Sequence, residues 1–302
     1  MSHFAADTHK ETIYYYRASW IQLFRPMTLT GTITPILTGT GMAAFQGGVR
    51  FNIFAAMLIA ALFVQSATNL FNDYYDFKHG QDQGKWTSDP LDAHGPAHHI
   101  VPYIAASLLS VAVIIGAWLA VQSTWWIVPA GVAGILFGYL YSAGPRPLCS
   151  IGLGETVAFT FLGPVVTVLS YVVQGNALDM TILAVSVPFA LIIASMILTN
   201  NIRDIKKDHF FRQTLATLLG RKNAIILLST LLTLAYLTVV SLVFGEILPL
   251  ASLIVLLAVP VAGRLQWSFR KPASRTEELG GMKWAAWHHW AFGLLLALSV
   301  WL

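Results

Sequence analysis

The stretch that decides the fold is residues 53–76, IFAAMLIAALFVQSATNLFNDYYD. Its apolar part is about 20 residues long, enough for a helix to cross a hydrocarbon core of about 30 Å. The run then ends in polar side chains at Asn69, Asn72, Asp73 and Asp76. The whole chain of 302 residues is 56% hydrophobic and only 11% charged, whereas about a quarter of a soluble domain is charged. We therefore predict an all-α integral membrane protein.

Similar apolar segments recur along the chain and predict about nine transmembrane helices in a bundle around a central cavity. The segments are Leu29–Ala44, Ile53–Tyr75, Ile100–Val121, Trp126–Tyr141, Leu153–Val173, Thr181–Arg203, Ala224–Phe244, Ile247–Arg264 and Trp284–Leu302. Residues 1–302 are read as a single domain, with a cytoplasmic segment at 1–28 and the bundle at 29–302. The first 28 residues lack a short apolar stretch with a small-residue cleavage site, so we expect no cleaved signal peptide. Cys149 is the only cysteine, which rules out an internal disulfide framework.

Basic residues gather in alternate loops of this predicted bundle. Of the 18 lysines and arginines, Arg50 is the only one outside the N-terminal segment and the loops on its side. The positive-inside rule makes that side cytoplasmic, with the C-terminus on the opposite side. We expect a multi-pass protein of the cell membrane. The net charge of +4 is explained by loops that face anionic lipid headgroups, so it calls for no nucleic-acid partner.

A second polar motif resembles the first. Residues 199–208, TNNIRDIKKD, end the sixth predicted helix, and both motifs contain Thr-Asn-x-x-x-Asp, beginning at Thr68 and Thr199. Their polar residues are three or four positions apart, so each set lies on one face of its helix. The shared pattern suggests a duplicated half, and the charge distribution places both motifs on the cytoplasmic side.

Several carboxylates on one helix face repel one another, and charged groups within a membrane cost about 2.5–3.5 kcal/mol each. A cation between them removes both costs. Oxygen ligands from Asp and Asn favour a hard ion, and Mg²⁺ fits because it takes one or two carboxylates together with phosphate oxygens. The alternative, that these are ordinary polar helix ends reaching water, explains a single motif better than two matching ones.

These motifs resemble the UbiA superfamily of membrane prenyltransferases, especially the branch that prenylates 1,4-dihydroxy-2-naphthoate in menaquinone synthesis. The resemblance rests first on Asn72-Asp73-x-x-Asp76 with Gly80 and Asp82, and on Asn200-Asn201-Ile202-Arg203-Asp204-x-x-x-Asp208. Three further segments agree, at residues 20–30, 141–155 and 163–175. The likeness covers about residues 20–220.

The resemblance implies magnesium-dependent transfer of a polyprenyl group from prenyl diphosphate to an aromatic acceptor at a site open to the cytoplasm. The residues implied to hold magnesium and act in catalysis are Asp73, Asp76, Asp204 and Asp208. The residues implied to complete that shell or bind the diphosphate are Asn69, Asn72, Asn200, Asn201, Arg25, Lys78, Asp82, Arg146, Arg203, Lys206 and Lys207. Tyr139 and Tyr141 are candidates for cation–π stabilisation of an allylic cation, and membrane lipid is expected around the isoprenoid tail.

Several alternatives stay open. The segments 83–96 and 209–213 differ from the branch's pattern, so the acceptor could be haem, 4-hydroxybenzoate or another phenol. Broken helices and internal duplication also suit a secondary transporter.

Arg25 and Arg146 could instead extend to headgroups, and the tyrosines could serve packing. Glu155 could orient one of these arginines. The histidines at 94, 98, 99, 288 and 289 could bind a transition metal, although neighbouring positions on a helix face different ways.

Overall fold

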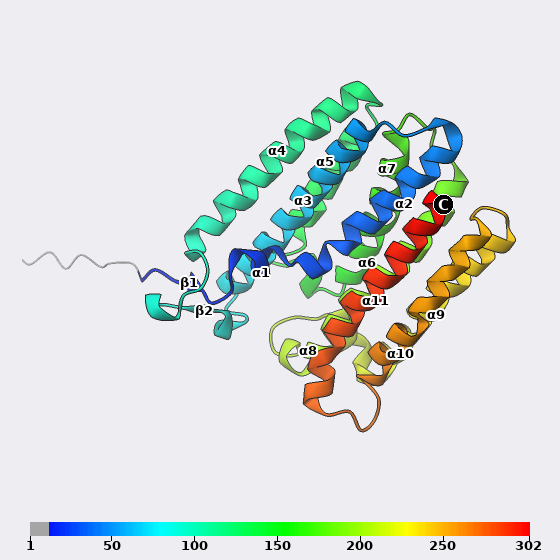
Figure 1. Ribbon diagram of the computed structural model, residues 1–302. Coiled ribbons are helices and arrows are strands. Elements are labelled where there is room, and N and C mark those ends of the chain that lie inside the picture. The colour runs from blue at the N-terminus through cyan, green and yellow to red at the C-terminus, as the bar shows by residue number, and fades with distance from the viewer. Residues whose placement is uncertain (1–11) are drawn as a thin grey trace, which may run out of the picture.

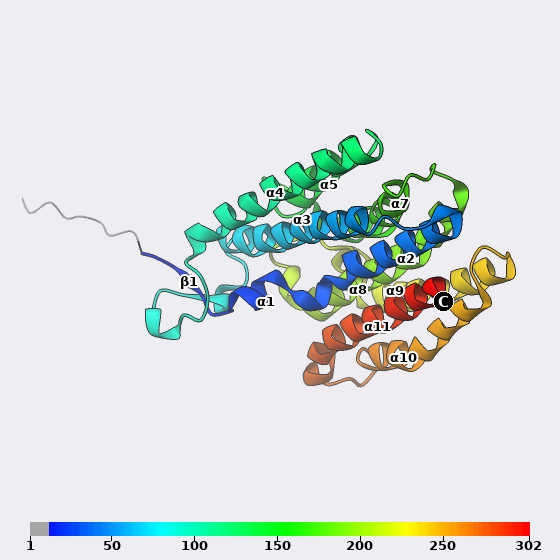
Figure 2. The same cartoon turned by 45° about the horizontal axis from the view of Figure 1, so that its top comes forward.

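The computed structural model describes residues 12–302 and is built almost wholly of helices (Figure 1). The first eleven residues of the predicted N-terminal segment lie outside the described residues. The main helices are α1 (Trp20–Phe24), α2 (Thr30–Gly47), α3 (Phe51–Lys78), α4 (Val101–Gln122), α5 (Ile127–Leu140), α6 (Gly154–Thr160), α7 (Val166–Val172), α8 (Met180–Asp208), α9 (Leu215–Phe244), α10 (Val259–Trp267) and α11 (Arg275–Trp301). Figures 1 and 2 show them side by side, with α4 at one edge of the bundle and α10 towards the other.

Six helical stretches are long and apolar enough to cross a membrane. They are Phe51–Lys78, His98–Gln122, Gly154–Val172, Met180–Asp208, Leu215–Phe244 and Leu250–Trp267. The other three predicted segments correspond to α2, α5 and α11, which are helical, but their crossing of the membrane stays a prediction. The protein is therefore a multi-pass membrane protein.

The helix α8 forms the middle of the bundle. It is the most enclosed of the long apolar helices, with 72% of its apolar window buried, and it packs against α6, α7, α9 and α11. A π-helical turn at Phe161–Val165 joins α6 to α7 and brings Gly163 against α8. A Cβ atom at Gly163 would lie 2.4 Å from Cβ of Ala190, so the close approach depends on glycine.

The polar connections at one end of the bundle are held together by a short strand pair. The strand β1 (Tyr15–Tyr16) pairs antiparallel with β2 (Trp86–Thr87). Next to it, the Arg17 amide donates to the Lys85 carbonyl at 2.9 Å. The segment between α3 and α4 is thereby fixed against the chain that precedes α1, so that Lys85 is held beside the end of α3.

At the opposite end of the bundle, Arg50 ties three connections together. Its side chain donates to the carbonyl of Gln122 at 3.0 Å and to the carbonyl of Val173 at 2.5 Å. Its own amide donates to Oε1 of Gln174 at 2.9 Å. Beneath these contacts lies a buried apolar cluster that includes Ile53 and Leu119.

Candidate functional site

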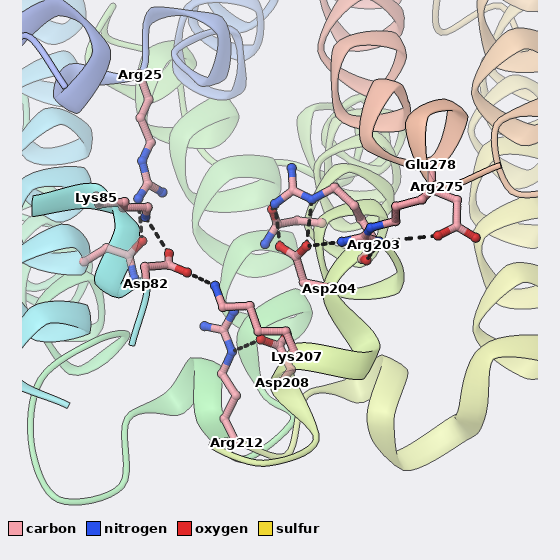
Figure 3. Close-up of polar contacts among 12 residues, drawn as sticks. Arg25, Asp82, Lys85, Arg203, Asp204, Lys207, Asp208, Arg212, Arg275 and Glu278 are labelled. Atoms are coloured by element: carbon pink, nitrogen blue, oxygen red, sulfur yellow. Dashed lines mark hydrogen bonds and ion pairs between the residues drawn. The ribbon is translucent and has the colours of Figure 1, made fainter. Parts of the chain in front are cut away.

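The two motifs meet over one cavity of about 870 Å³. Its polar end is lined by residues from the ends of α3 and α8, and its other end is lined by apolar residues that include Leu119, Ile127 and Val173. The prediction that both motifs lie on one side of the bundle is thus met: Lys207, at the end of α8, forms an ion pair with Asp82, which follows α3 (Figure 3). Asp82 also pairs with Lys85, whose Nζ lies 2.7 Å from Oδ2.

In the first motif, Asp73 is the centre of a basic cluster. Its side chain is 4% exposed, and its Oδ1 accepts from Arg25 at 2.8 Å and from Lys85 at 3.1 Å. Arg25 follows α1 in the left-handed region, with φ 53°, and it also donates to Oδ1 of Asn72 at 2.8 Å. Burial by itself would lower the pKa of the Arg25 guanidinium, but Asp73 and Asp76 together raise it. Arg25 therefore stays charged inside the protein.

Asp76 differs from Asp73, although it lies less than one helical turn away. It is buried and lines the cavity. Within residues 12–302, no lysine, arginine or histidine forms an ion pair with its carboxylate. A buried carboxylate without a counter-charge is costly, so Asp76 is suited to binding a cation.

In the second motif, Asp204 is held by two arginines. Arg203 donates from Nε at 3.0 Å and from Nη2 at 2.5 Å, and it also donates to Oδ1 of Asn200 at 2.7 Å. Arg275, at the start of α11, lies 3.7 Å from Oδ1 of Asp204 and donates to the Arg203 carbonyl at 2.5 Å. Figure 3 shows these groups on the side of the site away from Arg25.

Asp208 and Asn201 have different surroundings from the rest of their motif. Asp208 does not line the cavity, and its Oδ1 lies 2.9 Å from Nε of Arg212. Asn201 donates to Oε1 of Glu155 at 2.7 Å, so Glu155 contacts an asparagine and not an arginine as the sequence had suggested. Sequence reasoning missed Arg212, which does line the cavity. The only indication of Arg212 in the sequence was the unusual segment that follows the second motif.

The remaining candidates divide into those that line the cavity and those that do not. Asn69 and Tyr141 line it, and Asn69 donates to the Phe24 carbonyl at 3.0 Å. The residues outside the lining are Tyr139, Lys78, Arg146 and Lys206. Tyr139 is 39% exposed, and its hydroxyl bonds that of Tyr75 at 2.6 Å, so it takes part in an aromatic contact outside the cavity.

The predicted alternative of a histidine metal site has no support in the described part of the chain. His98 stacks on the ring of Tyr74 with centroids 4.5 Å apart, and His288 bonds the Tyr236 hydroxyl at 2.8 Å. Across residues 12–302, no group of three or more His, Cys, Asp or Glu side chains is close enough to hold a metal ion. In the acidic motifs, Arg25 and Lys85 pair with Asp73, and Arg203 pairs with Asp204.

Cys149 provides a check on the packing of this region. The thiol is buried against the loop that follows α5, and burial raises its pKa. Since the thiolate is the reactive form, maleimide at pH 8 is expected to label the folded protein in mild detergent at least about tenfold more slowly than the protein unfolded in SDS. Labelling followed by mass spectrometry measures both rates; equal rates would contradict the buried position.

Comparison with known proteins agrees with this arrangement. Residues 32–301 match the model of the UbiA prenyltransferase family. The chain is 34% identical over 282 residues to the 1,4-dihydroxy-2-naphthoate octaprenyltransferase of Bacillus subtilis (strain 168), covering 92% of this chain and 91% of that one. It is 31% identical over 229 residues to the enzyme of the same name from Mycobacterium tuberculosis, covering 72% and 75%.

A solved structure shares the fold. A UbiA homologue from Archaeoglobus fulgidus, bound to DMAPP and Mg²⁺, superposes with a TM-score of 0.62 at 13% identity and covers 93% of this chain and all of that one. The family match over nearly the whole described chain, together with the Bacillus relative, shows that this protein belongs to the UbiA prenyltransferase family and is a prenyltransferase.

Proposed function

We propose that this protein transfers a polyprenyl group from a prenyl diphosphate to 1,4-dihydroxy-2-naphthoate, in a magnesium-dependent step of menaquinone biosynthesis. The observation that carries the proposal is the meeting of both acidic motifs over one cavity whose far end is apolar. The polar end suits a diphosphate and the apolar end suits a hydrocarbon tail. The names of the Bacillus and Mycobacterium relatives support this acceptor.

The residues present fit magnesium. Asp73, Asp76 and Asp204 line the cavity with Asn72 and Asn200, and all of these offer the hard oxygen ligands that Mg²⁺ prefers. The carboxylate of Asp76 has no ion-pair partner among the described residues, which leaves it available. We keep Asp208 as the fourth proposed ligand although it does not line the cavity; its Oδ2 is buried and has no hydrogen-bond partner in the described part of the chain. When bound, magnesium would neutralise charge on the diphosphate oxygens.

The basic side chains of the site act on the same diphosphate. Arg25, Lys85, Arg203 and Lys207 line the polar end of the cavity, and charge-assisted hydrogen bonds from such groups to phosphate oxygens are strong. In the absence of substrate these cations pair with the motif carboxylates. A diphosphate that enters would draw them away from those carboxylates, so the side chains that neutralise the acidic motifs also bind the substrate.

The transfer itself breaks the bond between the allylic carbon and the diphosphate oxygen, and the electron pair leaves with the diphosphate. The ring carbon that carries the carboxylate then gives a π electron pair to the allylic cation and forms the new C–C bond. The bond from that carbon to the carboxylate breaks, CO₂ leaves, and the electron pair of the broken bond restores the aromatic ring. Water would trap that cation. The apolar walls of the cavity exclude water, and the ring of Tyr141 supplies a face for cation–π attraction.

We place the protein in the cell membrane with the cavity open to the cytoplasm. Among the basic residues of 12–302, Arg50 alone lies at the end of the bundle away from the motifs, which supports this orientation by the positive-inside rule. The acceptor is then reached from the cytoplasm, and the isoprenoid tail lies within the membrane and its lipid.

The test is an assay of purified protein in detergent with magnesium, radiolabelled polyprenyl diphosphate and candidate acceptors. Labelled product is expected with 1,4-dihydroxy-2-naphthoate and is expected to disappear with EDTA and return when magnesium is added back. Haem, 4-hydroxybenzoate and a simple phenol are run in parallel. Product with one of these but none with the naphthoate would overturn the acceptor, and substrate counterflow without any prenylated product would favour a transporter.

A further inference from the structure

Resting on the proposed function, we propose that the aromatic acceptor binds in a recess of the cavity formed by Tyr141, Cys149, Asn201 and Arg212, the acceptor recess. Arg212 binds the acceptor's carboxylate, and Oδ1 of Asn201 accepts a hydrogen bond from a ring hydroxyl. All four residues line the cavity. In the described part of the chain, none of the four forms an ion pair or side-chain hydrogen bond with Asp73, Arg25 or Lys85, the cluster that is assigned to the diphosphate.

Two loops and the last turns of α8 build this recess. The loop after α5 and the loop after α8 are joined where the Gln213 amide donates to the Ser150 carbonyl at 3.0 Å. The Cys149 amide donates to the Tyr141 carbonyl at 3.0 Å, which fixes the thiol beside the tyrosine. Gly154 packs against the ring, since a Cβ there would lie 3.3 Å from the Tyr141 hydroxyl. The tyrosine is therefore held in place, with its ring on the cavity wall.

Polar atoms without partners gather around this recess. Seven buried side-chain atoms in the described part of the chain lack a hydrogen-bond partner, and they include Oε2 of Glu155, Oδ2 of Asp208 and Nε of Arg212. The ion pair of Arg212 with Asp208 holds the two groups 2.9 Å apart without the alignment of a hydrogen bond. Buried polar groups are normally satisfied. Of these three residues only Arg212 lines the cavity, so its guanidinium is the group among them that a polar ligand in the cavity would satisfy.

Arg212 is more deeply buried than the other basic side chains of the site. The side chains of Arg25, Lys85, Arg203 and Lys207 are 24% to 43% exposed, whereas that of Arg212 is 13% exposed. The exposed cations suit a strongly hydrated diphosphate at the mouth. Arg212 instead has an aromatic ring and a thiol beside it, surroundings that suit a flat aromatic carboxylate. The planar guanidinium can also bind a carboxylate through two parallel hydrogen bonds.

Glu155 orients Asn201, the residue that makes the second polar contact to the acceptor. Because Oε1 of Glu155 accepts from Nδ2 of Asn201 at 2.7 Å, the amide oxygen of Asn201 is the atom left to face the cavity. That oxygen can only accept a hydrogen bond, so it selects a hydroxyl on the ligand. Glu155 is thus a positioning residue, and a ring that carries both a carboxylate and a hydroxyl meets Arg212 and Asn201 together.

The experiment compares two inhibitors that compete with the acceptor, 1-hydroxy-2-naphthoate and 1-naphthol, which differ only by the carboxylate. In the unaltered protein, we expect the inhibition constant of 1-hydroxy-2-naphthoate to be about 10- to 100-fold lower than that of 1-naphthol. A difference of this size in affinity is what a charge-assisted hydrogen bond usually contributes. In Arg212→Gln this ratio is expected to fall to about one. KM for the prenyl diphosphate is compared in the charge-keeping variant Arg212→Lys, where it is expected to stay within about twofold. In Arg212→Lys, which keeps the charge that Asp208 requires, the ratio is expected to be intermediate.

Glu155→Gln provides a second readout. Its side chain can present an N–H to Asn201 and so turn the amide, which is expected to raise the inhibition constants of both hydroxylated compounds equally. A ratio unchanged in both Arg212 variants would overturn the acceptor recess. So would a rise of tenfold or more in KM for the prenyl diphosphate in Arg212→Lys, because it would assign Arg212 to the diphosphate. If the unaltered protein prenylates no aromatic acceptor, the proposed function itself fails, which is a separate result.

Discussion

Replacing Asp76 by asparagine is expected to lower kcat/KM for prenyl transfer by at least about 1000-fold, because metal binding at this position is worth several kcal/mol in the transition state. The substitution keeps the size and shape of the side chain. The substitution breaks no ion pair among the described residues, so we expect the thermal midpoint of the variant to equal or slightly exceed that of the unaltered protein. Asp76→Asn therefore separates catalysis from folding, which a change at Asp73 would not do.

The measurement is initial-rate transfer of radiolabelled prenyl diphosphate, together with the thermal midpoint in detergent. Glu277→Gln is the matched control: it also changes a carboxylate to an amide at the same end of the bundle, but Glu277 pairs with Arg270 at 2.6 Å and does not line the cavity. Its transfer rate is expected to stay within about twofold of the original. If Asp76→Asn kept more than a tenth of the original transfer activity, Asp76 would not be a ligand of the metal ion.

The second large effect is expected at Gly163, where α8 approaches the π-helical turn. The added Cβ of Gly163→Ala would lie 2.4 Å from Cβ and 2.6 Å from Cα of Ala190. Backbone and a methyl group cannot swing aside as a long side chain can, so the turn and α8 have to separate. Overpacking of this kind costs about 1–3 kcal/mol, occasionally more, and we expect a value at the upper end of that range.

The free energy of unfolding in mixed micelles and the thermal midpoint both measure this change. Gly263→Ala is the control, because Gly263 is also in a helix and has nothing within 4 Å of its added Cβ. That variant is expected to be neutral or up to about 1 kcal/mol more stable, since alanine favours the helix. Equal midpoints for the two variants would mean that α8 and the π-helical turn are less tightly packed than described.

The sequence carries most of the information on the helices and on the two motifs, because both depend on local patterns. Apolar runs of membrane length mark the long helices, and the spacing of Asp73, Asp76 and Asp204 places them on helix faces that the structure brings to one cavity. The three segments that became α2, α5 and α11 show the limit of this reasoning. Their helicity follows from the sequence. The threonines of α2, the short length of α5 and the paired histidines and tryptophans of α11 nevertheless leave length and apolar composition insufficient to establish a span.

Contacts between distant segments were beyond that reasoning. Arg212 reaches the cavity only because its loop pairs with Ser150, about sixty positions earlier, and no periodic pattern records such a pairing. Tyr139 and Tyr141 are two residues apart, so on a helix they face different ways, and only Tyr141 lines the cavity. The link between Lys207 and Asp82 likewise depends on where two helices end relative to each other.

Arg50 has a consequence for the energetics of the cell. A water-filled passage through the bundle would let ions run down the membrane potential, which is worth about 2.3 kcal/mol per elementary charge at 100 mV. Arg50 joins the carbonyls of Gln122 and Val173 above the apolar end of the cavity, and the cluster beneath it contains Ile53 and Leu119. On the proposed placement in the cell membrane, we expect this closed end to prevent a water-filled passage from joining the two sides through the cavity.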